Sequence, residues 1–193
     1  MYGDPIQMIL RWFHFLAGIT WIGFLYYLNL VNVRMMASLD AGMRPTLIGA
    51  NLARVMAWFR HAAWVTVLMG ILLYYWIYLR ANVGMTDPKF VTVSLGGLLG
   101  IIMAFNVWVL IWPNQKKIIA AASAAQPPNP AWGRVALYAS RTNFVLSFPM
   151  LLYMGAASHF PMDFLPALMT GIIAGVIGAM VVFTVQKWAP EKF

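Results

Sequence analysis

The chain has 193 residues, of which 62% are hydrophobic and 9% are charged, and its mean hydropathy is +0.75. A soluble domain carries about 25% charged residues, so this composition excludes an ordinary water-facing domain. We attribute the net charge of +8 to membrane topology and to attraction toward anionic lipid, and we expect no nucleic acid among the partners.

Five long uncharged stretches predict membrane helices. They cover residues 12–33, 61–79, 90–115, 142–162 and 164–186. Each stretch is close to the roughly 20 residues that cross a bilayer as a helix. We therefore predict an all-α integral membrane protein, a bundle of five transmembrane helices over about residues 6–33, 58–80, 90–112, 135–159 and 164–187. The lipid bilayer is its first expected partner.

Basic residues predict the orientation of this single membrane domain (residues 1–193). Ten of the thirteen lysines and arginines are expected on one side: Arg34, Arg44, Arg54, Arg60, Lys116, Lys117, Arg134, Arg141, Lys187 and Lys192. The positive-inside rule then places the N-terminus outside and the C-terminus in the cytoplasm. Because Asp4 precedes the first apolar run and no basic segment does, we expect the first helix to be retained and not cleaved as a signal.

Two cytoplasmic segments, 34–57 and 113–134, are predicted between the helices. Apolar residues after Pro45 follow helical spacing, which fits an interfacial helix and equally an extension of the second membrane helix. Residues 118–133 contain Pro127, Pro128 and Pro130 and predict a loop.

Small residues recur every four positions in two of the predicted helices: Gly96, Gly100 and Ala104, then Gly171, Gly175 and Ala179. Such stripes allow helix backbones to approach closely in lipid. Within the fourth helix, Pro149 removes one backbone hydrogen bond and frees the carbonyl of Val145. We expect Ser147 or Asn143 to satisfy that carbonyl.

Chemistry in this chain must come from polar groups inside the membrane. There is no cysteine, which excludes disulfides, thiolate metal sites and a Cys-x-x-Cys-His haem attachment. Polar residues in lipid are costly and therefore candidate functional groups. They are His14, Asn29, Asn32, His61, Asn106, Asn143, Ser147 and His159.

Two of the three histidines form the predicted site. The orientation places His14 and His159 near the same outer boundary, and His61 at the opposite end. Gly18 follows His14 by four residues and Gly155 precedes His159 by four, so that in antiparallel helices both glycines lie on the bilayer-centre side of their histidine. This arrangement suits a flat macrocycle held between two imidazoles.

The hypothesis from these residues is one haem b, with His14 and His159 as iron ligands. Gly18 and Gly155 would make room for the ring, and Arg11, or else Arg80, would face the propionates. The alternatives are structural: His14 as an interfacial residue bonded to a carbonyl or water, and His159 as a cap of its helix C-terminus. An outer-face metal site that recruits Asp163 is a further alternative.

Three stretches together resemble a known family. They are Arg11 to Gly23 (Arg-Trp-Phe-His-Phe-Leu-Ala-Gly-Ile-Thr-Trp-Ile-Gly), Asn106 to Lys117 with its Trp-Pro-Asn-Gln-Lys-Lys ending, and Ser140 to the Ser-His pair at His159. They resemble the membrane domain of PuuD-type urate hydroxylases. The resemblance implies a multi-pass helical domain of the bacterial inner membrane that is coupled to cytochrome c, with urate oxidation assigned to forms that carry a fused cytochrome c domain.

Two departures from that family shape the expected function. Thr142 stands where the resemblance implies histidine in urate-oxidising relatives, and the chain resembles a stand-alone form that lacks the C-terminal cytochrome c domain. We therefore expect a redox-associated membrane subunit that exchanges electrons with cytochrome c or quinone. The alternative is a non-catalytic accessory subunit of a larger respiratory or photosynthetic complex. A urate hydroxylase-like membrane oxidoreductase is the third hypothesis, so whether the chain is an enzyme stays open.

Overall fold

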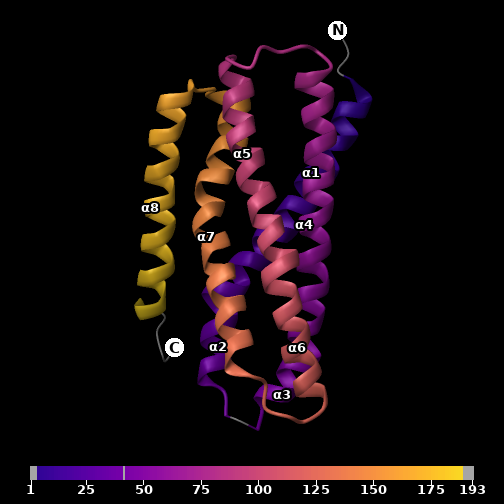
Figure 1. Cartoon of the computed structure of the whole chain (residues 1–193), viewed down its shortest axis with the longest axis vertical. Coiled ribbons are helices and arrows are strands. Elements are labelled where there is room, and N and C mark those ends of the chain that lie inside the picture. The colour runs from indigo at the N-terminus through magenta and orange to yellow at the C-terminus, as the bar shows by residue number, and fades with distance from the viewer. Residues whose placement is uncertain (1–3, 41, 189–193) are drawn as a thin grey trace.

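The computed structural model describes residues 4–40 and 42–188, with side chains up to residue 184. Its elements are helices that form five long rods side by side (Figure 1). The first rod joins α1 (Pro5–Tyr26), the π-helical η1 (Tyr27–Asn32) and α2 (Val33–Ser38). The second joins α3 (Arg44–Leu47), η2 (Ile48–Leu52), α4 (Ala53–Tyr74) and η3 (Tyr75–Leu79), and the third joins α5 (Pro88–Phe105), η4 (Asn106–Ile111) and α6 (Trp112–Ser123). The last two rods are α7 (Pro130–His159) and α8 (Phe164–Trp188).

Four of the rods are long and apolar enough to cross a membrane: Pro5–Ser38, Arg44–Leu79, Pro88–Ser123 and Phe164–Thr184. The remaining rod, α7, has 30 residues, is more polar, and packs against both α5 and α8. Large hydrophobic side chains such as Phe105, Ile172 and Phe183 are exposed on the outside of the bundle, as lipid contact requires. The fold is therefore a multi-pass helical bundle, and the side of the membrane on which each end lies stays a prediction.

The second rod begins earlier than the sequence analysis placed it. Its helix starts at Arg44 and not near residue 58, so the extension of the second membrane helix is the right alternative and the interfacial helix is wrong. Pro45 occupies the first turn, where its missing N–H costs nothing. Most of the segment 34–57 is therefore helical, and the break in it lies between Ser38 and Arg44.

The loop predicted over 118–133 is also too long. Alanines with high helix propensity carry α6 to Ser123. The helix ends where Ala125 adopts a φ of 54° and the N–H of Gln126 donates to the carbonyl of Ala121 at 2.9 Å. Asn129 then caps α7, whose first residue is Pro130. Lys192, one of the predicted cytoplasmic charges, lies outside the described residues.

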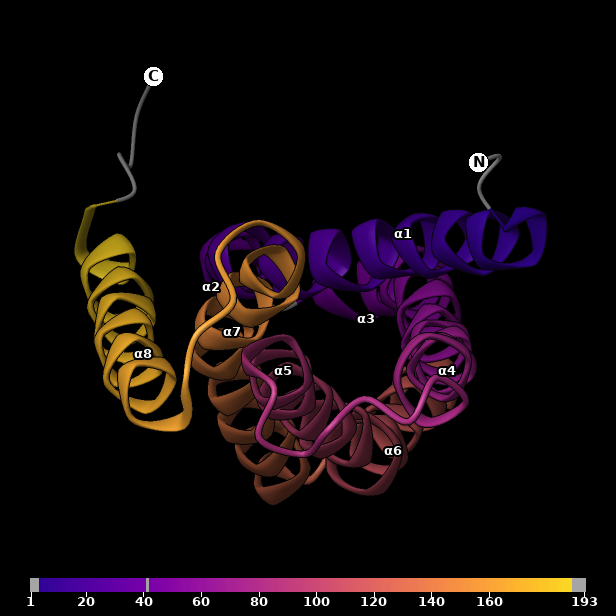
Figure 2. The same cartoon turned by 90° about the horizontal axis from the view of Figure 1, so that it is seen from above.

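The first four rods surround a central axis, and α8 covers the outer side of α7 (Figure 2). α1 packs mainly on α4, and α5 packs mainly on α7. α1 crosses the bundle obliquely, so that its N-terminal part lies beside α4 whereas α2 lies near α7 (Figure 2). We call the end that carries α2, α3, α6 and the start of α7 the basic end, because Arg44, Arg54, Lys116, Lys117 and Arg134 lie there (Figure 1).

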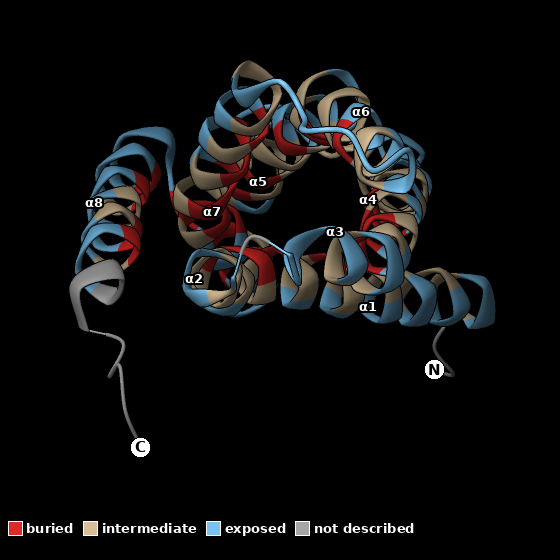
Figure 3. Cartoon of the chain, turned by 90° about the horizontal axis from the view of Figure 1, so that it is seen from below, coloured by how far each residue is buried: buried red, intermediate tan, exposed pale blue. Residues whose placement is uncertain are grey.

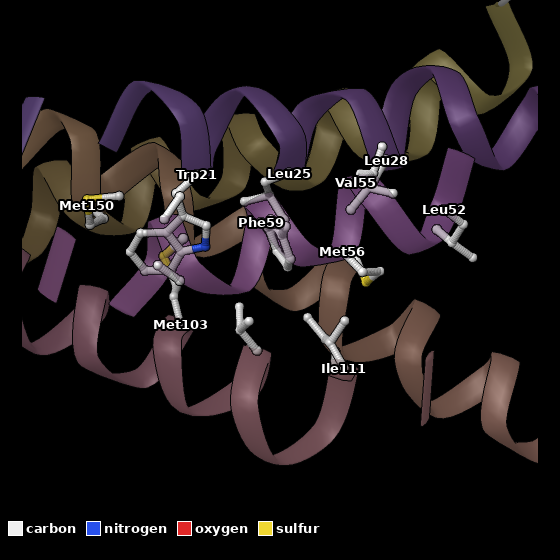
Figure 4. Close-up of a cluster of buried hydrophobic side chains, with 14 residues drawn as sticks. Trp21, Leu25, Leu28, Leu52, Val55, Met56, Phe59, Met103, Ile111 and Met150 are labelled. Atoms are coloured by element: carbon white, nitrogen blue, oxygen red, sulfur yellow. The ribbon is translucent and has the colours of Figure 1, made fainter. Parts of the chain in front are cut away.

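Apolar side chains fill the middle of the bundle (Figure 4). Trp21 and Leu25 from α1 meet Phe59 from α4 and Met103 from α5, and all four are almost fully buried. Buried residues face the axis of the ring and exposed residues face outward (Figure 3). This core separates the basic end from the half of the bundle that lies nearer the N-terminus.

Glycines seat α8 against α7. A Cβ on Gly178 would lie 2.8 Å from Cδ2 of Phe148 and 3.1 Å from the carbonyl oxygen of Val145. That carbonyl is the one that Pro149 frees, and the expectation that Ser147 or Asn143 bonds it is wrong. Ser147 donates to the carbonyl of Phe144 at 2.6 Å, and Asn143 donates to the carbonyl of Met103 at 2.8 Å. The Asn143 bond therefore joins α7 to α5, whereas the Ser147 bond lies within α7, and Oγ of Ser147 is also 3.1 Å from the hydroxyl of Tyr26 on α1.

Asn143 joins α7 to the third rod from a fully buried position. Its Nδ2 donates to the carbonyl of Met103, and its Oδ1 accepts from Nδ2 of Asn106 at 2.8 Å. We expect Asn143→Leu to lower the stability of the bundle by about 1–2 kcal/mol, because it leaves the Asn106 amide unpaired. The thermal midpoint of the detergent-solubilised protein measures this. Thr142→Leu, at an exposed neighbour, is the matched control, and equal midpoints for the two variants would contradict the role.

Asp4 caps the start of α1 and links it to η3 by hydrogen bonds. Its carboxylate accepts from the backbone N–H of Ile6 at 2.9 Å and from the indole N–H of Trp76 on η3. The Trp76 hydrogen bond is the main cause that lowers the pKa of this carboxyl below its ordinary value, with smaller help from the Ile6 and Gln7 amides. Because the folded pKa is depressed, the attachment should be intact above the ordinary pKa of aspartate and lost as the pH falls through the folded value.

Amide hydrogen exchange at the first turn of α1 tests this pH dependence. We expect protection to fall in the acidic range for the wild-type chain. In Asp4→Asn, the protection relative to the intrinsic exchange rate at each pH should be lower than in the wild type and nearly independent of pH over the same range. An acid-induced loss of protection in the variant equal to that of the wild type would contradict the assignment to Asp4.

Candidate functional site

A cavity of about 740 Å³ lies between the α1–α4 pair and the α5–α7 pair, in the half of the bundle nearer the N-terminus. Most of its wall is apolar. The polar or charged residues that line it are Arg11, His14, Thr66, Tyr74, Tyr78, Ser94 and Ser158. Its size is that of a small-molecule site, and few polar groups in a mostly apolar wall are typical of such sites.

Glycines keep this space open. Gly18, Gly70, Gly97 and Gly100 all line the cavity, and a Cβ on Gly97 or Gly100 would meet nothing within 4 Å. The oblique course of α1 also contributes, because α1 approaches α7 through Tyr26, whose hydroxyl is 3.1 Å from Oγ of Ser147 below the cavity. The glycines of the stripe on α5 therefore have two different roles. A Cβ on Gly96 would lie 3.0 Å from Cβ of Tyr153, so this glycine allows α5 and α7 to pack closely, whereas Gly100 faces the cavity.

His14 is held in one orientation by α4. Its Nδ1 is 2.9 Å from the carbonyl oxygen of Thr66. Since a carbonyl only accepts, Nδ1 carries the proton in this bond, and the lone pair of the neutral imidazole is then on Nε2. Gly70, one turn further along α4, makes room for the ring, because a Cβ there would lie 3.1 Å from His14 Cε1.

This bond is the one that the structural alternative for His14 predicted. It is also the bond that ligating histidines make, because a fixed Nδ1–H orients the ring and leaves Nε2 for the metal. Arg11, His14 and Gly18 therefore come together on one cavity. Arg80, the other candidate for the propionates, instead places its guanidinium over the Trp76 ring at 4.3 Å.

The structure does not bring His159 to this cavity. His159 and Gly155 line a separate pocket of about 580 Å³ between α7 and α8, and both are exposed. Ser158, the residue before His159, lines the His14 cavity. The ligation of one ring by both imidazoles stays a prediction. His61 is exposed and its ring centroid is 6.3 Å from that of Trp108, away from both pockets.

A metal site formed by carboxylates and histidines finds no support in the part of the chain that the structure describes. Within residues 4–40 and 42–188, no three His, Asp or Glu side chains lie close enough together to hold an ion. The alternative with Asp163 is therefore wrong for a site of three such ligands.

Sequence reasoning missed Thr66 and Gly70, which position His14, and the methionine pair Met150 and Met154, which faces the cavity from α7. Thr66 and Gly70 are four residues apart on one helix face, and that spacing is the signal that was present. It could not reveal their partner, because the role of Thr66 belongs to its backbone carbonyl. The methionines were indistinguishable from core residues by sequence.

One comparison with known proteins gives a match. The model of the family described as urate oxidase N-terminal matches residues 89–189, which is 101 of the 193 residues. The matched part spans α5 to α8 and includes Gly155 and His159, whereas Arg11, His14 and Gly18 precede it. No curated protein and no solved structure matches the chain.

Proposed function

Since the chain belongs to the urate oxidase N-terminal family, a membrane family as the resemblance to PuuD-type urate hydroxylases implied, we propose that it is a redox protein of the membrane that binds one haem b beside His14. The observation that carries the proposal is the hydrogen bond from His14 Nδ1 to the Thr66 carbonyl at the wall of an apolar cavity. It leaves Nε2 as a lone-pair donor on a residue that lines a mostly apolar cavity, and a polar group among membrane helices is a candidate functional group.

The lining residues fit a haem. The cavity is largely apolar, as a porphyrin face requires, and five glycines contribute no side chain to its walls. Arg11 is the cationic group on the lining that would pair with propionates. When bound there, the haem would supply one-electron chemistry, at a potential set by the residues that hold it and by the polarity of the pocket.

The chain's own groups would do the remaining work. The Thr66 carbonyl fixes the tautomer and direction of His14, and the apolar residues of α5 and α7 exclude water. The group that would hold the haem together with His14 is His159, as expected from the sequence, or a thioether of Met150 or Met154, which line the cavity. Electron exchange with a cytochrome c or a quinone belongs to the same proposal.

The reduced-minus-oxidised absorption spectrum of the purified protein tests this function. We expect a b-type spectrum with about one haem per chain, and a protein that purifies without any such band from haem-sufficient cells would overturn the proposal.

Urate oxidation is the second candidate function, and the family match favours it. Its test is urate-dependent reduction of added cytochrome c by the purified protein. A b-type spectrum without this activity would support electron transfer and contradict oxidation of urate by this chain under those conditions.

A further inference from the structure

Three arginines near the basic end of the bundle have guanidinium nitrogen atoms that are buried from solvent. Arg34 on α2 has a buried Nη2, and Arg60 on α4 and Arg141 on α7 each have a buried Nε, and none of these atoms has a hydrogen-bond partner among the described residues. A buried N–H of a charged group without a partner is costly, because it gives up hydration for nothing. Such atoms therefore indicate a missing acceptor.

Helix geometry places the three arginines within about 9 Å of one another along the bundle axis. Asn143 bonds to Asn106, and Arg141 precedes Asn143 by two residues, which is about 3 Å toward the basic end at 1.5 Å per residue. Arg60 extends to the Trp112 ring, with its Cζ 3.8 Å from the ring centroid, and Trp112 is six residues, about 9 Å, beyond Asn106 in the same direction.

The depth of Arg34 along the bundle axis follows from a different hydrogen bond, the one between Asn29 and Ser140. Asn29 donates to Oγ of Ser140 at 2.9 Å, and Arg34 is five residues beyond Asn29, or about 7.5 Å nearer the basic end. A long arginine side chain covers such differences in depth. The rods that carry the three residues all border the ring that is seen from this end (Figure 3).

The surroundings have the electrostatics of an anion site. Asp40, the acidic residue that the described chain has at this end, is exposed in the connection after α2. Arg54, Lys116, Lys117 and Arg134 are exposed near it and would attract anions. Because Arg60 stacks on Trp112, the edge of its guanidinium is the part left for hydrogen bonds, and that edge matches the two oxygens of a phosphate or carboxylate.

We propose that the bundle binds an oxyanion, a phosphate or carboxylate group, near its basic end through Arg34, Arg60 and Arg141. The site is separate from the His14 cavity and does not depend on haem. Its ligand is either the phosphate of an anionic lipid headgroup or a small anion from solution, since both offer the same acceptor oxygens.

Thermal unfolding of the whole chain in nanodiscs of phosphatidylcholine tests the proposal. One arm adds inorganic phosphate at constant ionic strength, balanced with chloride, and the other replaces part of the lipid with phosphatidylglycerol. At a saturating level of the right ligand the midpoint should rise by roughly 5 °C. A rise with phosphatidylglycerol alone identifies a lipid headgroup, and a rise with phosphate identifies a soluble anion.

Two pairs of variants separate the buried arginines from the exposed ones. Arg141→Lys and Arg60→Lys keep the charge but remove Nε–H and the planar fork, and the apparent affinity should fall by about tenfold. Arg134→Lys and Arg54→Lys, at exposed positions on the same helices, should bind as the wild type does. If one buried variant does not fold, the other carries the test. No shift with either probe, or equal shifts in all four variants, would overturn the site and leave water as the partner of these atoms.

Discussion

His14→Ala should abolish the b-type spectrum of the purified protein, with haem per chain reduced by at least about tenfold. The physical reason is that the Thr66 carbonyl holds the imidazole with Nε2 available, and within this cavity His14 is the one imidazole among the described lining residues. The measurement is the reduced-minus-oxidised spectrum together with the haem-to-protein ratio, taken on protein with an unchanged elution volume.

His61→Ala is the matched control, because His61 is exposed and lies away from both pockets. It should retain its haem. His159→Ala decides the second ligand: loss of the spectrum would support ligation by the two imidazoles, and retention would assign the second position to another group. Added imidazole should restore the band in His14→Gly by occupying the vacated space. A full spectrum in His14→Ala would contradict His14 as a ligand.

Gly171→Ala should disrupt the packing of α8 against α7 and lower the stability of the protein. A Cβ at Gly171 would overlap the hydroxyl of Tyr153 and lie 2.7 Å from its Cζ. Tyr153 is almost fully buried and donates to the carbonyl of Ala167 at 2.7 Å, so the phenol cannot move without losing that bond. Overpacking and the lost buried hydrogen bond together should cost about 2–5 kcal/mol.

The thermal midpoint and the rate of proteolysis in the short connection between α7 and α8 measure this effect. Gly175→Ala is the matched control on the same helix, because a Cβ there would meet nothing within 4 Å. Tyr153→Phe combined with Gly171→Ala should recover part of the loss, since the overlapping hydroxyl is then absent. Equal unfolding temperatures for Gly171→Ala and Gly175→Ala would contradict the close contact between Gly171 and Tyr153.

The two predictions concern different regions of the molecule. Loss of Gly171 acts on the packing of α8, which lies on the far side of α7 from the ring (Figure 2). Loss of His14 acts on a cavity that α8 does not line. The spectrum should therefore survive Gly171→Ala in protein that remains folded, and the thermal midpoint without haem should be little changed by His14→Ala.

Hydropathy and composition were enough to predict a multi-pass helical bundle, since exclusion of charge over about 20 residues follows from the bilayer itself. The resemblance to PuuD-type urate hydroxylases was also readable, and the match over residues 89–189 confirms it. Helix ends were predicted less well at Arg44 and Ser123, because charged and alanine-rich turns continue a helix without an apolar signal.

Partners across helices depended on the tertiary structure. The pairing of His14 with the Thr66 carbonyl has no sequence signal, because any residue has a carbonyl there. The crossing of α1 decides which helix faces His14, and it places His159 on another pocket although both were predicted at one depth. Depth along a membrane helix can be counted from the sequence, whereas rotation and tilt follow from packing against neighbours.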